Sequence, residues 1–189
     1  MSRGLTEGSL LLLDACCLIN LFATGRIEEI LQRLPYEFAT SSLVATKEVL
    51  TLVRSAGPPP LERELIPRSE LENLESLAIL DIATEEEMTQ FVRFAADLDD
   101  GEASVCALAV VRGGAVVTDD RKALSLLSRA APLIATTQTP EILWEWACLS
   151  QAPEDEIREL LRAVQERARF RPRRDAPRYN WWNSFFQGP

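Results

Sequence analysis

Short apolar runs alternate with segments of helical periodicity along most of this chain. The runs are bounded by Gly, Pro or polar residues, as expected for strands buried on both faces of a sheet. The predicted strands cover residues 10–13, 37–40, 77–82, 115–118 and 133–136. Strands that alternate with helices form a parallel sheet covered by helices. The sequence therefore predicts an α/β fold with three layers, α/β/α, around a central, mostly parallel sheet.

Capping residues and helix breakers set the expected helix boundaries. Helices are predicted over residues 15–24, 26–34, 42–54, 84–98, 101–112, 121–129 and from 139 onward. Thr84 and Glu87 have the spacing of a capping box, and the Gly113–Gly114 pair ends the helix that precedes it. The sequence SAGPPP at 55–60 interrupts the pattern, so the polar segment after it, to about residue 73, receives no element.

The length of 189 residues fits one domain with an extension. We expect an α/β domain over residues 8–149. Residues 150–189 are predicted to form a C-terminal helix, from 153 to about 169, and then a loose tail that is basic and rich in aromatic residues. The apolar stretch 9–23 is interrupted by polar residues and has no signal-peptide cleavage site, so we expect a cytoplasmic protein without a membrane partner.

The residue types present restrict the chemistry. The chain contains no histidine, which excludes Ser-His and Cys-His catalysis and histidine-ligated zinc or haem. Acid–base chemistry near neutral pH must then use carboxylates, lysines or water bound to a metal. The cysteines form no Cys-x-x-Cys pair and lie among apolar residues, so buried thiols are predicted in preference to a metal or redox role. They are Cys16, Cys17, Cys106 and Cys148.

Acidic residues follow the predicted strands or lie in the helices beside them. These residues are Asp14, Glu48, Glu102, Asp119 and Asp120. The carboxyl ends of parallel strands form one edge of a sheet, so we expect the side chains to converge there, with Glu48 inside the helix over 42–54. Each acid also has a purely structural interpretation, because Asp and Glu cap helices and a Glu at the rim can reach water.

Carboxylates that converge repel one another unless a cation lies between them. The sequence offers no lysine cluster to neutralise these acids. A divalent metal is the simplest solution, and ligands that are all oxygen favour Mg²⁺ or Mn²⁺ over zinc.

Four segments of the chain resemble the PIN-domain ribonucleases, a family that includes toxin ribonucleases of bacterial toxin–antitoxin pairs. They are LLLDACCLINL, the helix with Glu48, DDGEASVCALA and VVTDDRKA, within about residues 9–140. The resemblance implies a metal-dependent endoribonuclease that hydrolyses RNA phosphodiester bonds with Mg²⁺ or Mn²⁺. It also implies a homodimer and, for a toxin, an antitoxin protein as partner.

The resemblance implies roles for individual residues. The implied metal ligands are Asp14, Glu48, Glu102 and either or both of Asp119 and Asp120. The Thr118 hydroxyl would orient water or phosphate, and Glu48 or Asp120 would accept a proton from the attacking water. Ala15 and Cys16 depart from the small polar residues that many members have after the first Asp. The number of metal ions, one or two, stays open.

The tail differs in charge from the acidic body. Residues 1–150 carry 12 Lys+Arg and 23 Asp+Glu, a net charge of −11, whereas residues 151–189 carry 8 and 6, a net charge of +2. Arginine binds phosphate and aromatic rings stack on unpaired bases, so we predict that the tail helps to hold RNA. The predicted contacts are Arg169, Arg171, Arg173, Arg174, Trp181 and Trp182. Alternatively, the rings pack against the body or a second subunit.

Two other functional classes are compatible with part of the pattern. A catalytically weak PIN-like module would bind RNA or protein and use the acids structurally. A phosphatase with an aspartyl nucleophile would also have Asp14 after the first strand. That chemistry uses a second Asp two positions later, where this chain has Cys16, so the phosphatase is disfavoured.

Overall fold

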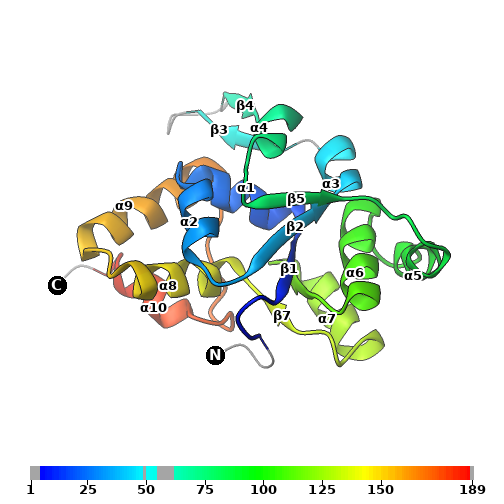
Figure 1. Ribbon diagram of the computed structural model, residues 1–189. Helices are drawn as coiled ribbons and strands as arrows, with labels where there is room; N and C mark the ends of the chain where they lie inside the picture. Colours follow the sequence, from blue (N-terminus) through cyan, green and yellow to red (C-terminus); the bar gives the residue numbers. More distant parts are fainter. Residues whose placement is uncertain (1–4, 49, 55–61, 188–189) are drawn as a thin grey trace.

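Strand β1 (Leu10–Leu13) lies at the centre of a five-stranded sheet (Figure 1). The computed structural model describes residues 5–48, 50–54 and 62–187. The strand order is β5-β2-β1-β6-β7, and every neighbouring pair is parallel. The other strands are β2 (Glu37–Ser41), β5 (Leu77–Leu80), β6 (Ala115–Val117) and β7 (Thr136–Thr137). The predicted parallel sheet is confirmed.

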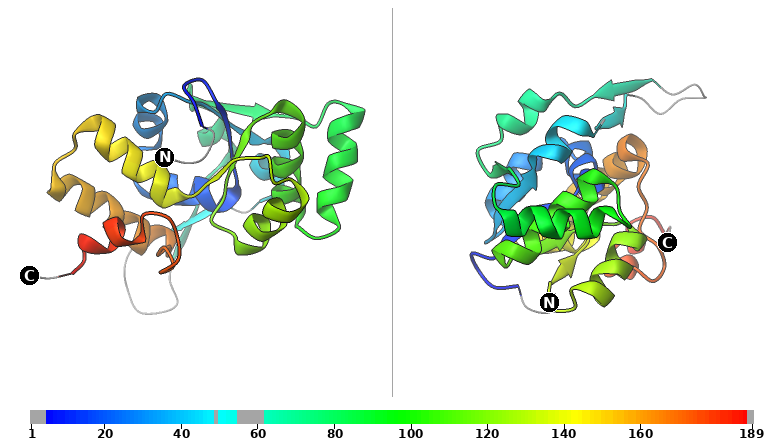
Figure 2. Two further views of the ribbon diagram at one scale, coloured as in Figure 1. Left: turned by 90° about the horizontal axis from the view of Figure 1, so that it is seen from below. Right: turned by 90° about the vertical axis from the view of Figure 1, so that its right-hand side faces the viewer.

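Helices cover both faces of this sheet (Figures 1 and 2). One face carries α1 (Ala15–Ala23), α2 (Ile27–Arg33), α8 (Thr139–Ser150), α9 (Glu154–Ala163) and α10 (Tyr179–Ser184). The other carries α6 (Asp100–Arg112), α5 (Glu85–Ala95), which packs on the outside of α6, and α7 (Arg121–Ala130). The expected three-layer α/β/α architecture is therefore confirmed.

The central strand is apolar because both of its faces are covered. Leu11, Leu12 and Leu13 are fully buried. Thr84 and Glu87 form the predicted capping box at the start of α5. Gly113 has a φ of +70° and ends α6, as the glycine pair predicts. None of the described helices is long and apolar enough to span a bilayer.

The prediction of one helix over 42–54 is wrong. Helix α3 (Ser42–Lys47) ends early, and Glu48 takes an extended backbone with φ −78° and ψ 138°. The chain then forms β3 (Thr51–Val53), which pairs antiparallel with β4 (Arg63–Leu65). Pairing with a later segment outweighs the local helical pattern here, which periodicity alone does not reveal.

The sequence predicts no helix or strand between the breaker sequence at 55–60 and about residue 73, but part of this segment has regular structure. It holds β4 and the short helix α4 (Arg68–Glu72). The breaker sequence at 55–60 lies outside the described residues. The last strand is predicted over 133–136, but it covers only Thr136–Thr137 (β7). Its pairing with β6 begins where Thr136 lies opposite Val116. Leu133 is 97% exposed in the turn before it.

The C-terminal segment is folded against the body, so the expectation of a loose tail is wrong. The predicted C-terminal helix is present as α9, and it ends in a π-helical turn, η1 (Val164–Ala168). Arg169 follows with a left-handed φ of 59°. Helix α10 then contacts α8, and Trp182 is 2% exposed with its ring edge-on to Phe170 at 5.7 Å. The aromatic residues therefore extend the core.

The cysteines differ in exposure, although all four are free thiols. Cys17 and Cys106 are buried, as predicted. Cys16 is half-buried and Cys148 is exposed, so the prediction of burial is wrong for Cys148. Cys148 lies near the end of α8.

Candidate active site

Asp14 lies at the carboxyl end of β1 and caps the N-terminus of α1. Its Oδ1 accepts a hydrogen bond from the Ala15 N–H at 2.6 Å, and its Oδ2 accepts one from the Thr118 hydroxyl at 2.9 Å. The residue is only 4% exposed. This burial is the main cause that raises the pKa of the Asp14 carboxyl. An anionic Asp14 is therefore held at an energetic cost that a nearby cation would offset.

Thr118 connects Asp14 to the acidic pair that follows β6. Its hydroxyl oxygen accepts a hydrogen bond from the Asp120 N–H at 3.1 Å, and its O–H donates a hydrogen bond to Asp14 Oδ2. Asp120 in turn caps α7, because its Oδ1 accepts from the N–H groups of Lys122 and Ala123 at 2.7 and 2.9 Å. Strands β1 and β6 are parallel neighbours, so their carboxyl ends bring the two acids to one edge.

The side chain of Asp119 is held by the helices of the opposite face. Its Oδ2 accepts a hydrogen bond from Asn20 Nδ2 at 3.0 Å, and its Oδ1 accepts one from the Thr139 N–H at 3.1 Å. Burial raises the pKa of the Asp119 carboxyl. Both carboxylate oxygens are thus engaged by α1 and by the start of α8. The two adjacent acids therefore differ, since Asp119 is bound by α1 and the start of α8 whereas Asp120 caps α7.

Glu48 lies against the start of α6, although it ends α3 instead of lying inside a longer helix. A Cβ atom on Gly101 would stand 2.6 Å from Glu48 Oε1, so the absence of a side chain at Gly101 makes room for the carboxylate. Burial, followed by the negative charges of Asp99, Asp14 and Asp100, raises the pKa of the Glu48 carboxyl. Glu48 therefore belongs to the same electrostatic cluster as Asp14.

Glu102 completes this cluster from the first turn of α6. Its backbone N–H donates to Asp99 Oδ1 at 2.9 Å. Burial, together with the charges of Asp99, Asp14 and Asp120, raises the pKa of the Glu102 carboxyl to about 7. Negative charge thus links four of the predicted acids, since the charge of Asp14 acts on Glu48 and Glu102 and that of Asp120 acts on Glu102.

These four acids fit a cation site by their charge and chemistry. In the part of the chain that the structure describes, none of the ion pairs formed by arginines involves one of them. Their ligand atoms are all oxygens, which suit Mg²⁺ or Mn²⁺. Burial is the main cause of the raised pKa values of Asp14, Glu48 and Glu102, and neighbouring negative charges add to it.

Sequence reasoning missed two sets of residues at this edge. Asp99 and Asp100 add negative charge next to Glu48, and the Asp-Asp doublet before Gly101 is the signal that could have found them. Asn20 is one of the polar residues that interrupt the apolar stretch 9–23. Its side chain, 3% exposed, positions Asp119, and its signal is an amide in an otherwise apolar helix.

The predicted nucleic-acid-binding residues are divided among different surroundings. Arg171 and Arg173 line a groove with Asp119, Asp120 and Gln138, directly beside the acids. Arg174 and Trp181 line a second pocket, and Arg169 is exposed outside both. Trp182 is buried in the core, which corrects the expectation of a ring that is free to stack on a base.

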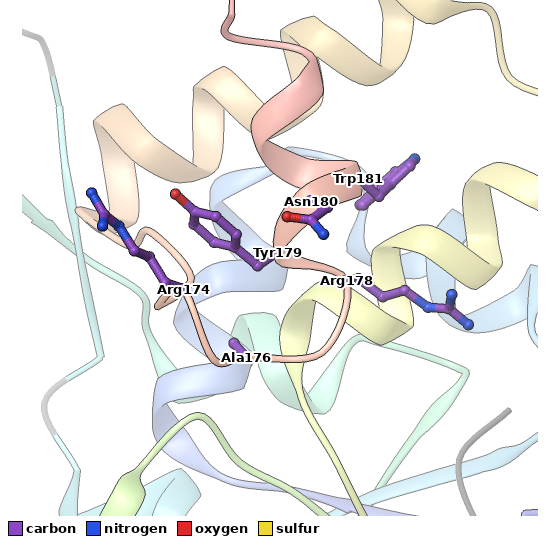
Figure 3. A pocket seen from close by; sticks show the side chains of 6 residues that line it. All are labelled: Arg174, Ala176, Arg178, Tyr179, Asn180 and Trp181. Carbon is purple, nitrogen blue, oxygen red and sulfur yellow. The ribbon is translucent and has the colours of Figure 1, made fainter.

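The second pocket is formed by the loop that leads into α10 (Figure 3). Arg174 and Tyr179 lie on one side of this loop, and Arg178 points to the other side. The Arg178 guanidinium stacks over the Trp144 ring of α8 at 3.5 Å from its centroid. Arg178 therefore anchors α10 to the body.

A parallel sheet covered by helices, with carboxylates at its carboxyl edge, agrees with a nuclease-type fold. A family model described as PIN domain matches residues 10–173. The chain belongs to the PIN-domain family, whose members are in general nucleases. A comparison with curated proteins returns no match.

We expect Glu102→Gln to stabilise the metal-free protein at alkaline pH. The folded state keeps a proton on Glu102 up to about pH 7, whereas the same carboxyl group in the unfolded chain loses its proton near pH 4.5. Metal-free stability should therefore fall as pH rises from 4.5 to 7, and the neutral variant avoids this loss. Thermal unfolding in EDTA should show a gain of about 1–2 kcal/mol at pH 8, a figure reduced for solvent screening, and almost none at pH 4.5.

Glu86→Gln is the matched control, because Glu86 is exposed in the first turn of α5. It should leave the pH dependence unchanged. A gain from Glu102→Gln that is the same at pH 4.5 and pH 8 would show that Glu102 titrates normally in the folded protein.

Proposed function

We propose that this protein is a divalent-cation-dependent endoribonuclease that hydrolyses RNA phosphodiester bonds. The proposal depends on one observation above all: Asp14 and Asp120 come after neighbouring parallel strands, and the charge of Asp14 acts on both Glu48 and Glu102. None of the ion pairs among the described residues involves one of these four acids. Membership of the PIN-domain family supports the nuclease class. The test is cleavage of single-stranded RNA that requires Mg²⁺ or Mn²⁺ and yields a 5′-phosphate and a 3′-hydroxyl.

We assign the cation to the four converging acids. A divalent cation there would neutralise charge on the scissile phosphodiester and acidify water. Asp119 is left out of this set, because its carboxylate lies against Asn20 and Thr139 and its charge is not among those that raise the pKa of Glu48 or Glu102. Asp120 keeps its Oδ2 for a ligand, because the described capping bonds use only Oδ1.

The chain's own residues orient this site. The Thr118 hydroxyl is already shared between Asp14 and the Asp120 N–H, so we assign it to holding the two acids in place and not to orienting water or phosphate. Glu48 is the better of the two proposed proton acceptors, because Asp120 is committed to the cap of α7 and Glu48 is not. The two roles proposed for Glu48, cation ligand and proton acceptor, require that its carboxylate stay against Gly101.

Gly101→Ala is expected to lower activity without destabilising the fold. The atoms nearest to the new methyl group would be Oε1, Cδ and Cγ of the flexible Glu48 side chain, so we expect Glu48 to move and the backbone to stay. Misplacing a catalytic group by about 1 Å costs roughly 10- to 100-fold in rate. The rate of RNA cleavage should fall by that factor while the melting temperature stays the same or rises, since Ala is the better helix former.

A double-mutant cycle distinguishes this effect from a general disturbance. If Gly101→Ala acts through Glu48, then adding it to Glu48→Gln should cause little further loss. Additive losses would mean that the methyl group damages the site by another route.

We propose that RNA lies along the groove formed by the tail beside the acids. Arg171 and Arg173 line this groove together with Asp120. Arg173 Nη1 is buried and has no hydrogen-bond partner among the described residues, and its Nε lies 3.6 Å from Asp175. A buried guanidinium N–H without a partner is costly and suits an anionic oxygen. Phosphates on either side of the scissile bond would supply such oxygens.

Replacing Arg171 and Arg173 together by Ala should weaken RNA binding and make it less dependent on salt. Each lost phosphate contact reduces the slope of log K against log salt by about 0.7 for a single strand, so the double variant should lose about 1.4. Binding to a catalytically inactive form, followed over a range of salt, measures this slope. Arg68→Ala, on the exposed helix α4, is the control and should change nothing. An unchanged slope in the double variant would rule out the groove.

The cleavage assay also distinguishes the alternative class. A PIN-like module that only binds RNA or protein would show no metal-dependent turnover. The toxin role, an antitoxin partner and a homodimer stay predictions, and a small neighbouring reading frame whose product inhibits cleavage would support the first two.

A further inference from the structure

Two adjacent thiols and a carboxylate form a compact group beside the proposed catalytic acids. Cys16 and Cys17 lie in the first turn of α1, and Asp119 follows β6. One ligand atom from each of the three residues lies within 4.8 Å of the other two. The ligand atoms of the proposed catalytic acids are all oxygens, whereas this group offers two sulfurs and one oxygen.

Two of the three distances between ligand atoms in this group are close to those of a tetrahedral zinc site. Zinc–sulfur bonds of about 2.3 Å at a tetrahedral angle place two sulfurs about 3.8 Å apart. The Cys16 and Cys17 sulfurs are 3.9 Å apart. A zinc–oxygen bond of about 2.0 Å places the oxygen about 3.5 Å from each sulfur. The Cys17 sulfur is 3.4 Å from Asp119 Oδ2.

The carboxylate of this group is already oriented by neighbouring side chains. Asn20 Nδ2 donates to Asp119 Oδ2 at 3.0 Å, and the Thr139 N–H holds Asp119 Oδ1. Hydrogen bonds of this kind fix the ligands of metal sites. Cys17 is fully buried and Cys16 is half-buried, so an ion would enter from the side of Cys16.

We propose that Cys16, Cys17 and Asp119 bind a thiophilic divalent cation, Zn²⁺, at a site separate from the catalytic carboxylates. Thiolates select zinc over Mg²⁺, because Mg²⁺ prefers hard oxygen ligands. Three protein ligands leave the fourth tetrahedral position to water. Both thiol protons leave as the ion binds.

Occupation of this site changes the surroundings of Asp14. The Cys16 thiol donates to Asp14 Oδ2 at 3.1 Å, and this hydrogen bond is lost when the thiol proton leaves. Asp14 then has a bound ion next to it and one donor fewer. Zinc therefore inhibits the RNA cleavage described above. This consequence depends on the proposed function, whereas zinc binding itself does not.

Titration with Co²⁺ as a spectroscopic substitute for zinc tests the proposal on the full-length protein. Thiolate ligands give sulfur-to-cobalt charge-transfer absorption in the near ultraviolet, and oxygen ligands do not. We expect this absorption to saturate at one Co²⁺ per chain, to survive excess Mg²⁺ and to disappear on addition of Zn²⁺. Cys148→Ser, which removes the exposed thiol on α8, should behave like the wild type.

Substitutions within the group decide whether these thiols are the ligands. Cys16→Ser and Cys17→Ser should each weaken cobalt binding by about 100-fold or more and reduce the absorption. Cys16→Ser is the safer variant, because Cys16 is half-buried, and a thermal melt checks that each variant is folded. Asp119→Asn should weaken binding while the absorption per bound ion remains.

Three results would overturn the proposal. They are the absence of charge-transfer absorption in folded wild-type protein, full absorption in both Cys→Ser variants, and its loss in Cys148→Ser. Failure of the nuclease proposal looks different, since the cobalt spectrum would then be present in a protein that never cleaves RNA with Mn²⁺.

Discussion

Asp14→Asn is expected to abolish metal-dependent RNA cleavage while the protein stays folded. Asn keeps an oxygen that can accept the Ala15 N–H and cap α1, so the local structure persists. It removes the buried negative charge that would hold the cation. Cation binding contributes several kcal/mol to the transition state, so the loss should be about 10³-fold. Cleavage of a labelled single-stranded RNA in Mn²⁺ measures it.

Two further substitutions make the result specific. Asp97→Asn removes an exposed carboxylate outside the cluster and should leave the rate unchanged. Asp120→Asn should inactivate the protein as Asp14→Asn does, because Asp120 is the acid of its pair that repels Glu102. Full activity in Asp14→Asn would refute the nuclease proposal. Inactivation by Asp119→Asn but not by Asp120→Asn would reverse the roles of the pair.

Trp182→Ala is expected to destabilise the whole domain strongly. The side chain is 2% exposed and packs edge-on against Phe170, so truncation leaves a large cavity. Removal of a buried aromatic side chain costs about 3–5 kcal/mol. For a chain of this size that corresponds to a fall of about 10 °C in the melting temperature, which calorimetry measures.

Trp181→Ala provides the comparison, since Trp181 is half-buried and its ring contacts Phe185 at 5.5 Å. It should cost much less than Trp182→Ala. Equal melting temperatures for Trp182→Ala and the wild type would mean that the tail does not belong to the core. The result also affects how RNA binding is tested, because deletion of the tail from Arg169 would remove Trp182 and disturb the fold.

Much of the candidate site could be predicted from local pattern. Asp14 follows β1 directly and the pair Asp119–Asp120 comes one residue after β6, and in a parallel sheet such positions share one edge. Glu102 was predictable because the segment after Gly101 is apolar on almost all sides and must be a buried helix. Glu48 was placed at the right edge but in the wrong element, since the end of α3 depends on the later pairing of β3 with β4.

The sequence by itself determined the parallel α/β fold and the acids at the end of its strands, because buried strands and capped helices leave strong local patterns. Only the tertiary structure decided how the pair Asp119–Asp120 divides, that Trp182 lies in the core, and that Cys16 and Cys17 meet Asp119. The physical reason is that each of these outcomes depends on partners distant in the chain, such as Asn20, Thr139 and Phe170. Hydrogen bonds and packing between such partners have no periodic signature in the sequence.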